Sequence, residues 1–177
     1  DGRRDVIAST KGALDYLTYL HKFFDGNWLH ALAAYNSGEG RVRRAIRKNQ
    51  KAGKSIDFWS LDLPNETRAY VPKLLALADI LANHQNYDFS WPEIENSPVI
   101  EIVDIDSQID LGFAADLAGL SLKELSALNP GFSRWATDPD GPHKLLLPKH
   151  IASEFGLALA QVDDTDRLNW ERHKIQR

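Results

Sequence analysis

The segment from Ala33 to Gly40 places a phenol, a carboxamide and two glycines close together at the end of an apolar stretch. Asn36 offers paired donors and acceptors, which suit the acetamido and hydroxyl groups of an amino sugar. Glycines such as Gly38 allow a bulky ligand to approach the backbone closely. One interpretation of these residues is a sugar-binding surface formed by Tyr35, Asn36 and Gly38. The competing interpretation, which chemistry alone favours, is that Tyr35 is a core residue and Asn36 only caps a helix.

The carboxylates nearest to this segment are poor candidates for a general acid. Glu39 and Glu66 both lie at expected helix starts, where the helix dipole favours the ionised form. A general acid instead needs a pKa that an apolar pocket has raised. We therefore expect structural roles for both. The six histidines show no ligand spacing on one face, so we expect no metal and no cofactor.

Apolar periodicity predicts only helices in the first half of the chain. Asn27 is a suitable N-cap for the second of them. Pro72 is expected to kink or divide the last one, because proline removes a backbone donor and clashes with the preceding turn. The loop at 55–64 is expected to be anchored by the aromatic residues Phe58 and Trp59. The expected helices span residues 5–24, 28–35, 41–52 and a longer stretch that begins at 65.

The second half of the chain predicts a small domain with the order strand, helix, helix, strand. Residues 99–105 alternate in a way typical of a short strand, and residues 144–147 form a second apolar run stopped by proline. Between them lie a helix at 111–117 and another that opens with a capping box of Ser121 and Glu124. A further helix is expected at 151–162. The candidate core residues are Leu111, Ala115, Leu117, Leu120, Leu125 and Leu128.

Composition narrows the possible partners. The chain is 43% hydrophobic and 26% charged, which is typical of a globular protein. A net charge of −4 argues against a nucleic-acid partner, and the basic run at 41–54 is interpreted as a solvated helix face. The absence of cysteine excludes disulfides and thiolate metal sites. The absence of methionine suggests that Asp1 is an internal residue of a longer protein, so that any membrane anchor would lie outside this chain.

Four short motifs in order resemble the soluble lytic transglycosylase family, whose catalytic domain is similar to goose lysozyme. Together they cover about ninety residues, and the third narrows the resemblance to a membrane-bound branch. The motifs are Asp1-Gly2-Arg3-Arg4-Asp5 with Ser9-Thr10, Ala34-Tyr35-Asn36-x-Gly38, Trp59-Ser60-Leu61, and Glu66-Thr67-x-x-Tyr70-Val71.

This resemblance implies cleavage of peptidoglycan glycan strands without water. In the family one buried glutamic acid protonates the bond between N-acetylmuramic acid and N-acetylglucosamine, and the muramyl 6-hydroxyl then gives a 1,6-anhydro product. The expected Glu-Ser and Gly-Leu-x-Gln motifs before the equivalent of Asp1 are not in this chain. By the same resemblance, Tyr70 would orient the missing glutamate, while Tyr35 and Asn36 would line the sugar subsites. Without the resemblance, Tyr70 would be interpreted as a packing phenol.

The second domain resembles a degenerate LysM module, a unit that binds N-acetylglucosamine chains. The residues Asp106-Ser107-Gln108-Ile109 depart from the usual Gly-Asp-Thr-Leu, so a spacer role stays open. We expect a mainly α fold with boundaries at 1–92, 93–150 and 151–177: a partial lysozyme-like helical domain, a βααβ LysM-like domain, and a helix leading into a truncated further LysM module. The expected partner is the peptidoglycan glycan strand, in the periplasm, with outer-membrane anchoring of the parent protein. The alternative is a non-catalytic peptidoglycan-binding or scaffolding protein.

Overall fold

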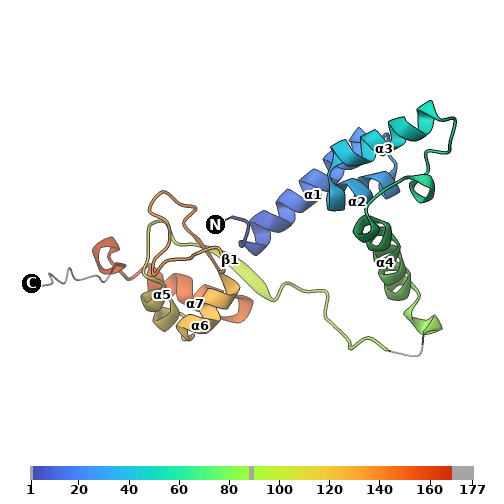
Figure 1. Cartoon of the computed structure of the whole chain (residues 1–177). Helices are drawn as coiled ribbons and strands as arrows, with labels where there is room; N and C mark the ends of the chain where they lie inside the picture. The colour runs from blue at the N-terminus through green and yellow to red at the C-terminus, as the bar shows by residue number, and fades with distance from the viewer. Residues whose placement is uncertain (1, 88–89, 169–177) are drawn as a thin grey trace, which may run out of the picture. The chain divides into compact units, whose positions relative to one another are not determined.

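The computed structural model describes residues 2–87 and 90–168. The chain divides into two compact units, which are described separately. One unit contains Thr10–Ile94 and is helical, and the other contains Glu95–Arg177 together with Asp1–Ser9 (Figure 1). Within the described residues, no helix is both long and apolar enough to cross a membrane.

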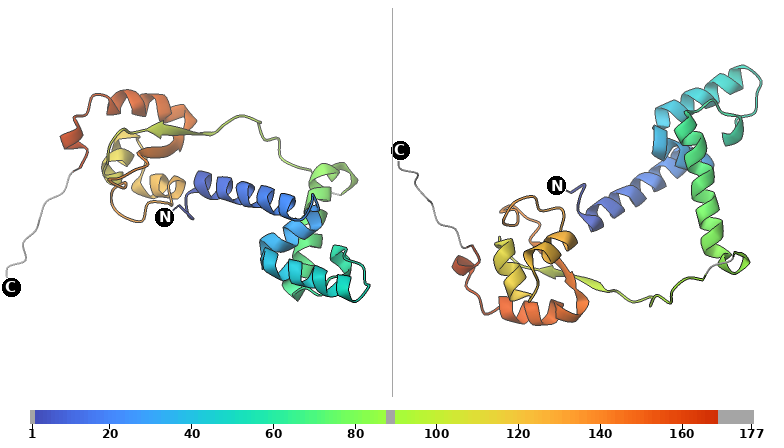
Figure 2. Two further views of the ribbon diagram at one scale, coloured as in Figure 1. Left: turned by 90° about the horizontal axis from the view of Figure 1, so that it is seen from above. Right: turned by 60° about the horizontal axis from the view of Figure 1, so that its bottom comes forward.

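Four α-helices form the helical unit, except that the first residues of α1, up to Ser9, group with the other unit. The order of the helices along the chain follows the sequence-based prediction. Asn27 caps the second helix as expected, because its side-chain oxygen accepts the backbone N–H of His30 at 3.1 Å. α2 contacts both α3 and α4 (Figure 2). The helices are α1 (Val6–Phe23), α2 (Trp28–Ser37), α3 (Glu39–Lys51) and α4 (Asn65–Ala82), with short 3-10 turns at Phe58–Ser60 and His84–Asn86.

The core of the helical unit is built around α2 and takes residues from all four helices and the loop before α4. Ala31, Ala33 and Ala34 are fully buried, and small side chains there let neighbouring helices approach closely. Phe58 anchors the following loop in this core, as predicted. The prediction for Trp59 was wrong, because its side chain is 62% exposed and contacts Phe58 only by its edge.

The proline in α4 does not divide the helix. α4 runs from Asn65 to Ala82 without a break at Pro72. Proline removes one backbone hydrogen bond, and the turns on either side retain theirs. The adjacent Val71 is fully buried in the helical core, which holds this part of α4 in place.

The second unit has the predicted order of strand, helix, helix and strand, followed by one more helix. Strand β1 (Ile100–Asp104) pairs antiparallel with β2 (Lys144–Pro148), with Ile102 opposite Leu146. Between them lie α5 (Leu111–Leu117) and α6 (Leu122–Leu128), and β2 leads directly into α7 (Lys149–Leu159). α6 opens with the predicted capping box, in which Ser121 and Glu124 exchange hydrogen bonds.

The core of this unit differs from the predicted one at its edges. Leu111, Ala115 and Leu125 are buried as expected, and Leu117 and Leu120 pack against them. The prediction for Leu128 was wrong: it is half-buried and lines a surface pocket instead of joining the core. The prediction missed buried residues in the loop after β1, in α5 and the residue that caps it, in β2 and in α7. They are Ile105, Ile109, Ala114, Ala118, Leu145, Leu147, Ala152, Phe155 and Leu159.

Helix α7 packs against both strands and against α5, and its residue Phe155 is 1% exposed. The segment after α7 also returns to the unit, because Arg167 donates to the backbone oxygen of Ile105 at 2.6 Å. We therefore propose that the LysM-like domain extends beyond residue 150 to include α7. The expected opening strand of a further LysM module at 173–177 lies outside the described residues.

Candidate functional site

Asn36 joins the two most informative sequence motifs. The hydroxyl of Thr67 donates to Asn36 Oδ1 at 2.8 Å, and Asn36 Nδ2 donates to Glu66 Oε1 at 3.3 Å. Thr67 is 1% exposed, so this link is anchored in the core. The end of α2 and the first turn of α4 are thus held together by side chains about thirty residues apart in sequence.

This geometry gives Asn36 a structural role that the sequence did not reveal. Its amide uses one acceptor site and one donor within the protein. An amide has two donors and two acceptor sites, so one of each remains for another partner. Asn36 does not cap α2, which ends at Ser37 with Gly38 as its C-cap. It is a fixed group that connects two helices and retains hydrogen-bonding capacity.

Tyr35 and Gly38 lie at the accessible end of α2. Tyr35 is 38% exposed, which does not fit the interpretation of a fully buried core residue. Gly38 adopts φ +87°, a backbone conformation that favours glycine. Apart from Gly38 itself and its two chain neighbours, no described residue has an atom within 4 Å of the position that a Cβ of Gly38 would occupy. The backbone at Gly38 is therefore open to an approaching group, as the sequence analysis expected.

Tyr70 is positioned one turn after Glu66 on α4. Its side chain is half-buried and packs against the helical core. The next residue in the chain, Val71, is a buried member of that core. This packing fixes the ring in place. The described contacts fit a packing phenol and equally fit a phenol that presents its hydroxyl at the edge of the site.

Glu39 is held in the ionised form, as the helix-start argument predicted. Its pKa is lowered first by a hydrogen bond from its own backbone N–H at the start of α3, and then by the hydroxyl of Tyr16. The hydroxyl of Tyr16 donates to Glu39 Oε2 at 2.8 Å. The same hydrogen bond raises the pKa of Tyr16 above its usual range. Glu39 therefore lacks the raised pKa that a general acid requires.

Two residues at this site were missed by sequence reasoning. Thr67 lies within the Glu-Thr motif, but only the fold shows that its hydroxyl meets Asn36. Tyr16 lies on α1, and its ring is 5.9 Å from that of Tyr35. No signal in the sequence could have found Tyr16, because nothing in its local pattern distinguishes it from other aromatic residues of α1.

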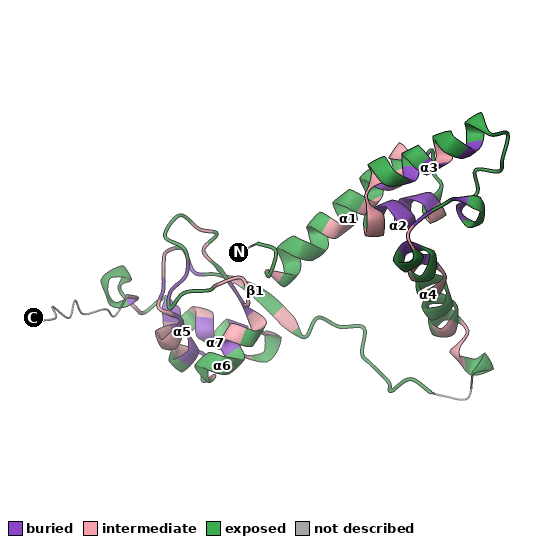
Figure 3. Ribbon diagram, viewed as in Figure 1, coloured by how far each residue is buried: buried purple, intermediate pink, exposed green. Residues whose placement is uncertain are grey.

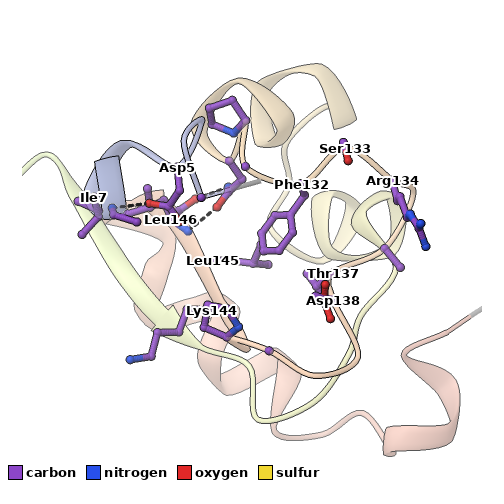
Figure 4. Close-up of a pocket in the computed structure, with 18 of the residues that line it drawn as sticks. Asp5, Ile7, Phe132, Ser133, Arg134, Thr137, Asp138, Lys144, Leu145 and Leu146 are labelled. Atoms are coloured by element: carbon purple, nitrogen blue, oxygen red, sulfur yellow. Dashed lines mark hydrogen bonds between the residues drawn. The ribbon is translucent and has the colours of Figure 1, made fainter. Parts of the chain in front are cut away.

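The second unit carries a surface pocket beside the loop between α6 and β2, and residues of the N-terminal segment Asp1–Ser9, including Asp5 and Ile7, also line it (Figure 4). Phe132 and Leu145 contribute its apolar surface, while Thr137 and Lys144 contribute polar groups. Gln108 Nε2 donates to the backbone oxygen of Thr137 at 2.7 Å, which ties the loop after β1 to this loop. In the described parts of the chain, no group of three acidic or histidine side chains is arranged to hold a metal.

Comparison with known families defines the class of protein. Residues 1–58 match the family model described as "Transglycosylase SLT domain". Residues 99–164 match the model described as "Lytic transglycosylase MltD, LysM-like domain". The chain is thus homologous to lytic murein transglycosylases over most of its length.

Two curated relatives narrow this assignment. The chain is 46% identical over 160 residues to the membrane-bound lytic murein transglycosylase D of Escherichia coli strain K12, an alignment that covers 90% of this chain. It shows the same identity and coverage with the protein of that name from Escherichia coli O6:H1 strain CFT073. The chain spans 35% of the length of these relatives.

Proposed function

We propose that the intact protein is a peptidoglycan lytic transglycosylase and that this chain forms part of its substrate groove. In this proposal the enzyme cleaves the β-1,4 bond between N-acetylmuramic acid and N-acetylglucosamine without water, and leaves 1,6-anhydro ends. The observation that carries the proposal is the hydrogen-bonded link from Asn36 to Glu66 and Thr67. This link fixes an amide that still has an unused hydrogen-bond donor and acceptor site. The amide lies next in sequence to the accessible Tyr35 and close to the open backbone of Gly38.

The catalytic acid of the proposed reaction is not among the carboxylates of this site. Glu39 has a lowered pKa, and Glu66 is engaged with Asn36 in the first turn of α4. A glycosidase with two carboxylates needs them on opposite sides of the scissile bond, whereas the proposed reaction needs a single protonated one. We therefore propose that a glutamic acid outside this chain supplies the proton and that the isolated chain is inactive.

The proposal is tested by incubating the purified chain with murein sacculi. We expect no release of 1,6-anhydro-muropeptides, while a longer protein that includes the proposed acid should release them. Release by this chain alone would overturn the assignment of the acid, and Glu39→Gln and Glu66→Gln variants would then identify the group responsible. A longer protein that binds sacculi without cleaving them would support the alternative, a non-catalytic scaffolding protein.

Tyr70 is proposed to orient the catalytic acid in the intact enzyme. A fixed phenol that hydrogen-bonds a carboxyl group holds its rotamer, and correct geometry contributes strongly to general-acid catalysis. Tyr70→Phe keeps the ring that packs on the helical core. It should lower kcat by roughly one to two orders of magnitude, the usual scale for losing an orienting contact.

Tyr35→Phe serves as the comparison for Tyr70→Phe. Tyr35 is proposed to contact the sugar, so removal of its hydroxyl should act mainly on KM. Both variants are compared at matched melting temperatures. An unchanged turnover for Tyr70→Phe would make Tyr70 a packing residue and would leave the groove proposal for Tyr35 intact.

The pocket of the LysM-like unit supports a second, smaller proposal, that this unit also binds the glycan. Phe132 and the 54% exposed Trp135 both line the pocket and offer flat faces for sugar rings. Quenching or enhancement of indole fluorescence by chitooligosaccharides, lost in Trp135→Leu, would support this role. An unchanged spectrum would favour a spacer.

The proposed location is the cell envelope, with the enzyme acting in the periplasm. The printed names of both relatives describe them as membrane-bound. We propose that the intact protein is held at the outer membrane by an anchor outside this chain. Fractionation of cells that produce the intact protein tests this location.

A further inference from the structure

Four aromatic rings form a continuous row that starts at Tyr35. The ring of Tyr35 lies 5.9 Å from that of Tyr16, which stacks on Tyr19 at 6.0 Å, and Tyr19 lies 5.8 Å from Phe23. Tyr16, Tyr19 and Phe23 follow one face of α1, because residues three and four apart are neighbours on a helix. We call these four residues the aromatic row. It links the end of α2 to the last turn of α1.

The row is accessible and held in place. Tyr16 is 37% exposed and Tyr19 is 48% exposed, values similar to that of Tyr35. Tyr16 is fixed by its hydrogen bond to Glu39, and the guanidinium of Arg43 lies over the ring of Phe23 at 5.7 Å from its centroid. Tyrosine rings fixed in this way lose little conformational entropy when a ligand binds.

We propose that the aromatic row binds the glycan strand beyond the contact at Tyr35. The proposal rests on the proposed function, in which Tyr35 contacts an amino sugar. A strand of β-linked sugars presents apolar C–H faces that stack on aromatic rings, while its hydroxyl and acetamido groups need hydrogen-bond partners. The row offers both, because tyrosine combines an apolar ring with a polar hydroxyl and Glu39 adds a fixed carboxylate.

The chemistry of the row distinguishes it from the exposed leucines of this unit. Leu14 on α1 and Leu77 and Leu81 on α4 are each more than half exposed and offer only aliphatic surface. Such side chains suit contacts with protein, since they provide no hydrogen-bonding group for a sugar. The tyrosines of the row carry hydroxyls at an accessible edge. A glycan is therefore the occupant that fits the row.

The test compares short and long chitooligosaccharides in binding titrations monitored by NMR or calorimetry. Tyr19→Leu removes the aromatic face in the middle of the row but keeps apolar volume. It should weaken the binding of long oligosaccharides roughly fivefold to tenfold, the scale of one lost aromatic contact, and leave the disaccharide nearly unchanged. Tyr19→Trp, which restores an aromatic face, should restore the affinity.

Tyr87→Leu is the matched control for Tyr19→Leu. Tyr87 is 40% exposed and, like Tyr16, its hydroxyl donates to a carboxylate on a helix, Asp79, at 2.6 Å. It lies outside the row, so its replacement should not affect oligosaccharide binding of either length. Circular dichroism confirms that each variant keeps the helical content of the unmodified chain.

The outcomes separate this inference from the proposed function. If oligosaccharides shift the NMR signals of Tyr35 but Tyr19→Leu binds long ones normally, the row is overturned and the sugar contact at Tyr35 stands. If no oligosaccharide shifts the signals of Tyr35, the proposed groove itself fails. If Tyr19→Leu and Tyr87→Leu lost equal affinity for long oligosaccharides, the effect would be assigned to stability. That result would also overturn the proposal that the aromatic row binds the glycan.

Discussion

The two units of this chain close their cores in different ways. In the LysM-like unit, two strands and three helices surround one cluster, and Arg167 adds a hydrogen bond from the segment after α7. In the helical unit only α2 is largely buried, while most of α1 and α4 is exposed (Figure 3). The large exposed apolar side chains of α1 and α4 include Leu14, Leu75, Leu77 and Leu81.

This difference predicts which unit is the more stable by itself. Burial of apolar surface is the main favourable contribution to folding, so the unit with the closed core should be stable alone. Contiguous exposed apolar residues mark surfaces that another element covers. In the helical unit, the exposed leucines of α1 and α4 have no such cover among the described residues.

The largest effect on stability is expected from a substitution in the core of the LysM-like unit. Phe155→Ala removes a ring that is 1% exposed and should lower the free energy of unfolding of this unit by about 3–5 kcal/mol. The helical unit should be unaffected, because Phe155 belongs to the other core. Urea denaturation followed by NMR signals from each unit measures the two stabilities separately.

Leu157→Ala is the control on the same helix. Leu157 is 68% exposed, so its truncation should change the free energy of unfolding by less than about 0.5 kcal/mol. Simultaneous unfolding of both units in Phe155→Ala would show that they are coupled and would remove the contrast between them.

A smaller effect is expected where the candidate site joins α2 to α4. Thr67→Val removes the hydroxyl that donates to Asn36 and should destabilise the helical unit by about 1 kcal/mol. It should also weaken sugar binding, because Asn36 loses one of its two positioning bonds. The matched control is Thr18→Val on α1, whose exposed hydroxyl bonds only to the backbone of its own helix, at Leu14. Equal effects of the two variants would argue against a special role for the link.

The smallest expected effect is a dependence of the helical unit on pH. Burial lowers the pKa of His30, opposed by its hydrogen bond to the backbone oxygen of Ile56 at 2.9 Å. The unfolded chain therefore binds a proton more readily than the folded one. The stability contributed by neutral His30 is present above its ordinary pKa and is lost as pH falls from about 6.5 toward the lowered value.

The melting temperature of the helical unit should fall as pH is lowered through this range. In the His30→Gln variant the melting temperature should depend less steeply on pH. Glu39, whose pKa is lowered, contributes in a separate and more acidic range, because its stabilisation is lost only as pH falls below its ordinary pKa. An identical slope in the variant would mean that another group titrates.

The sequence by itself determined the local structure and the family. The N-cap at Asn27 and the capping box of Ser121 and Glu124 were predicted correctly because each acts within three residues along the chain. The strand-helix-helix-strand order was also confirmed, since alternation and helical periodicity are properties of short segments. The ordered motifs indicated the transglycosylase family for the same reason: each is a local string of residues.

Only the tertiary structure decided which side chains meet and which face the solvent. It placed Thr67 against Asn36, Tyr16 beside Glu39, and Trp59 outside the core, although the local sequence gave no sign of these outcomes. It also made α7 part of the LysM-like core through Phe155. The physical reason is that burial and side-chain hydrogen bonds depend on how helices pack, and packing brings together residues that the chain itself keeps far apart.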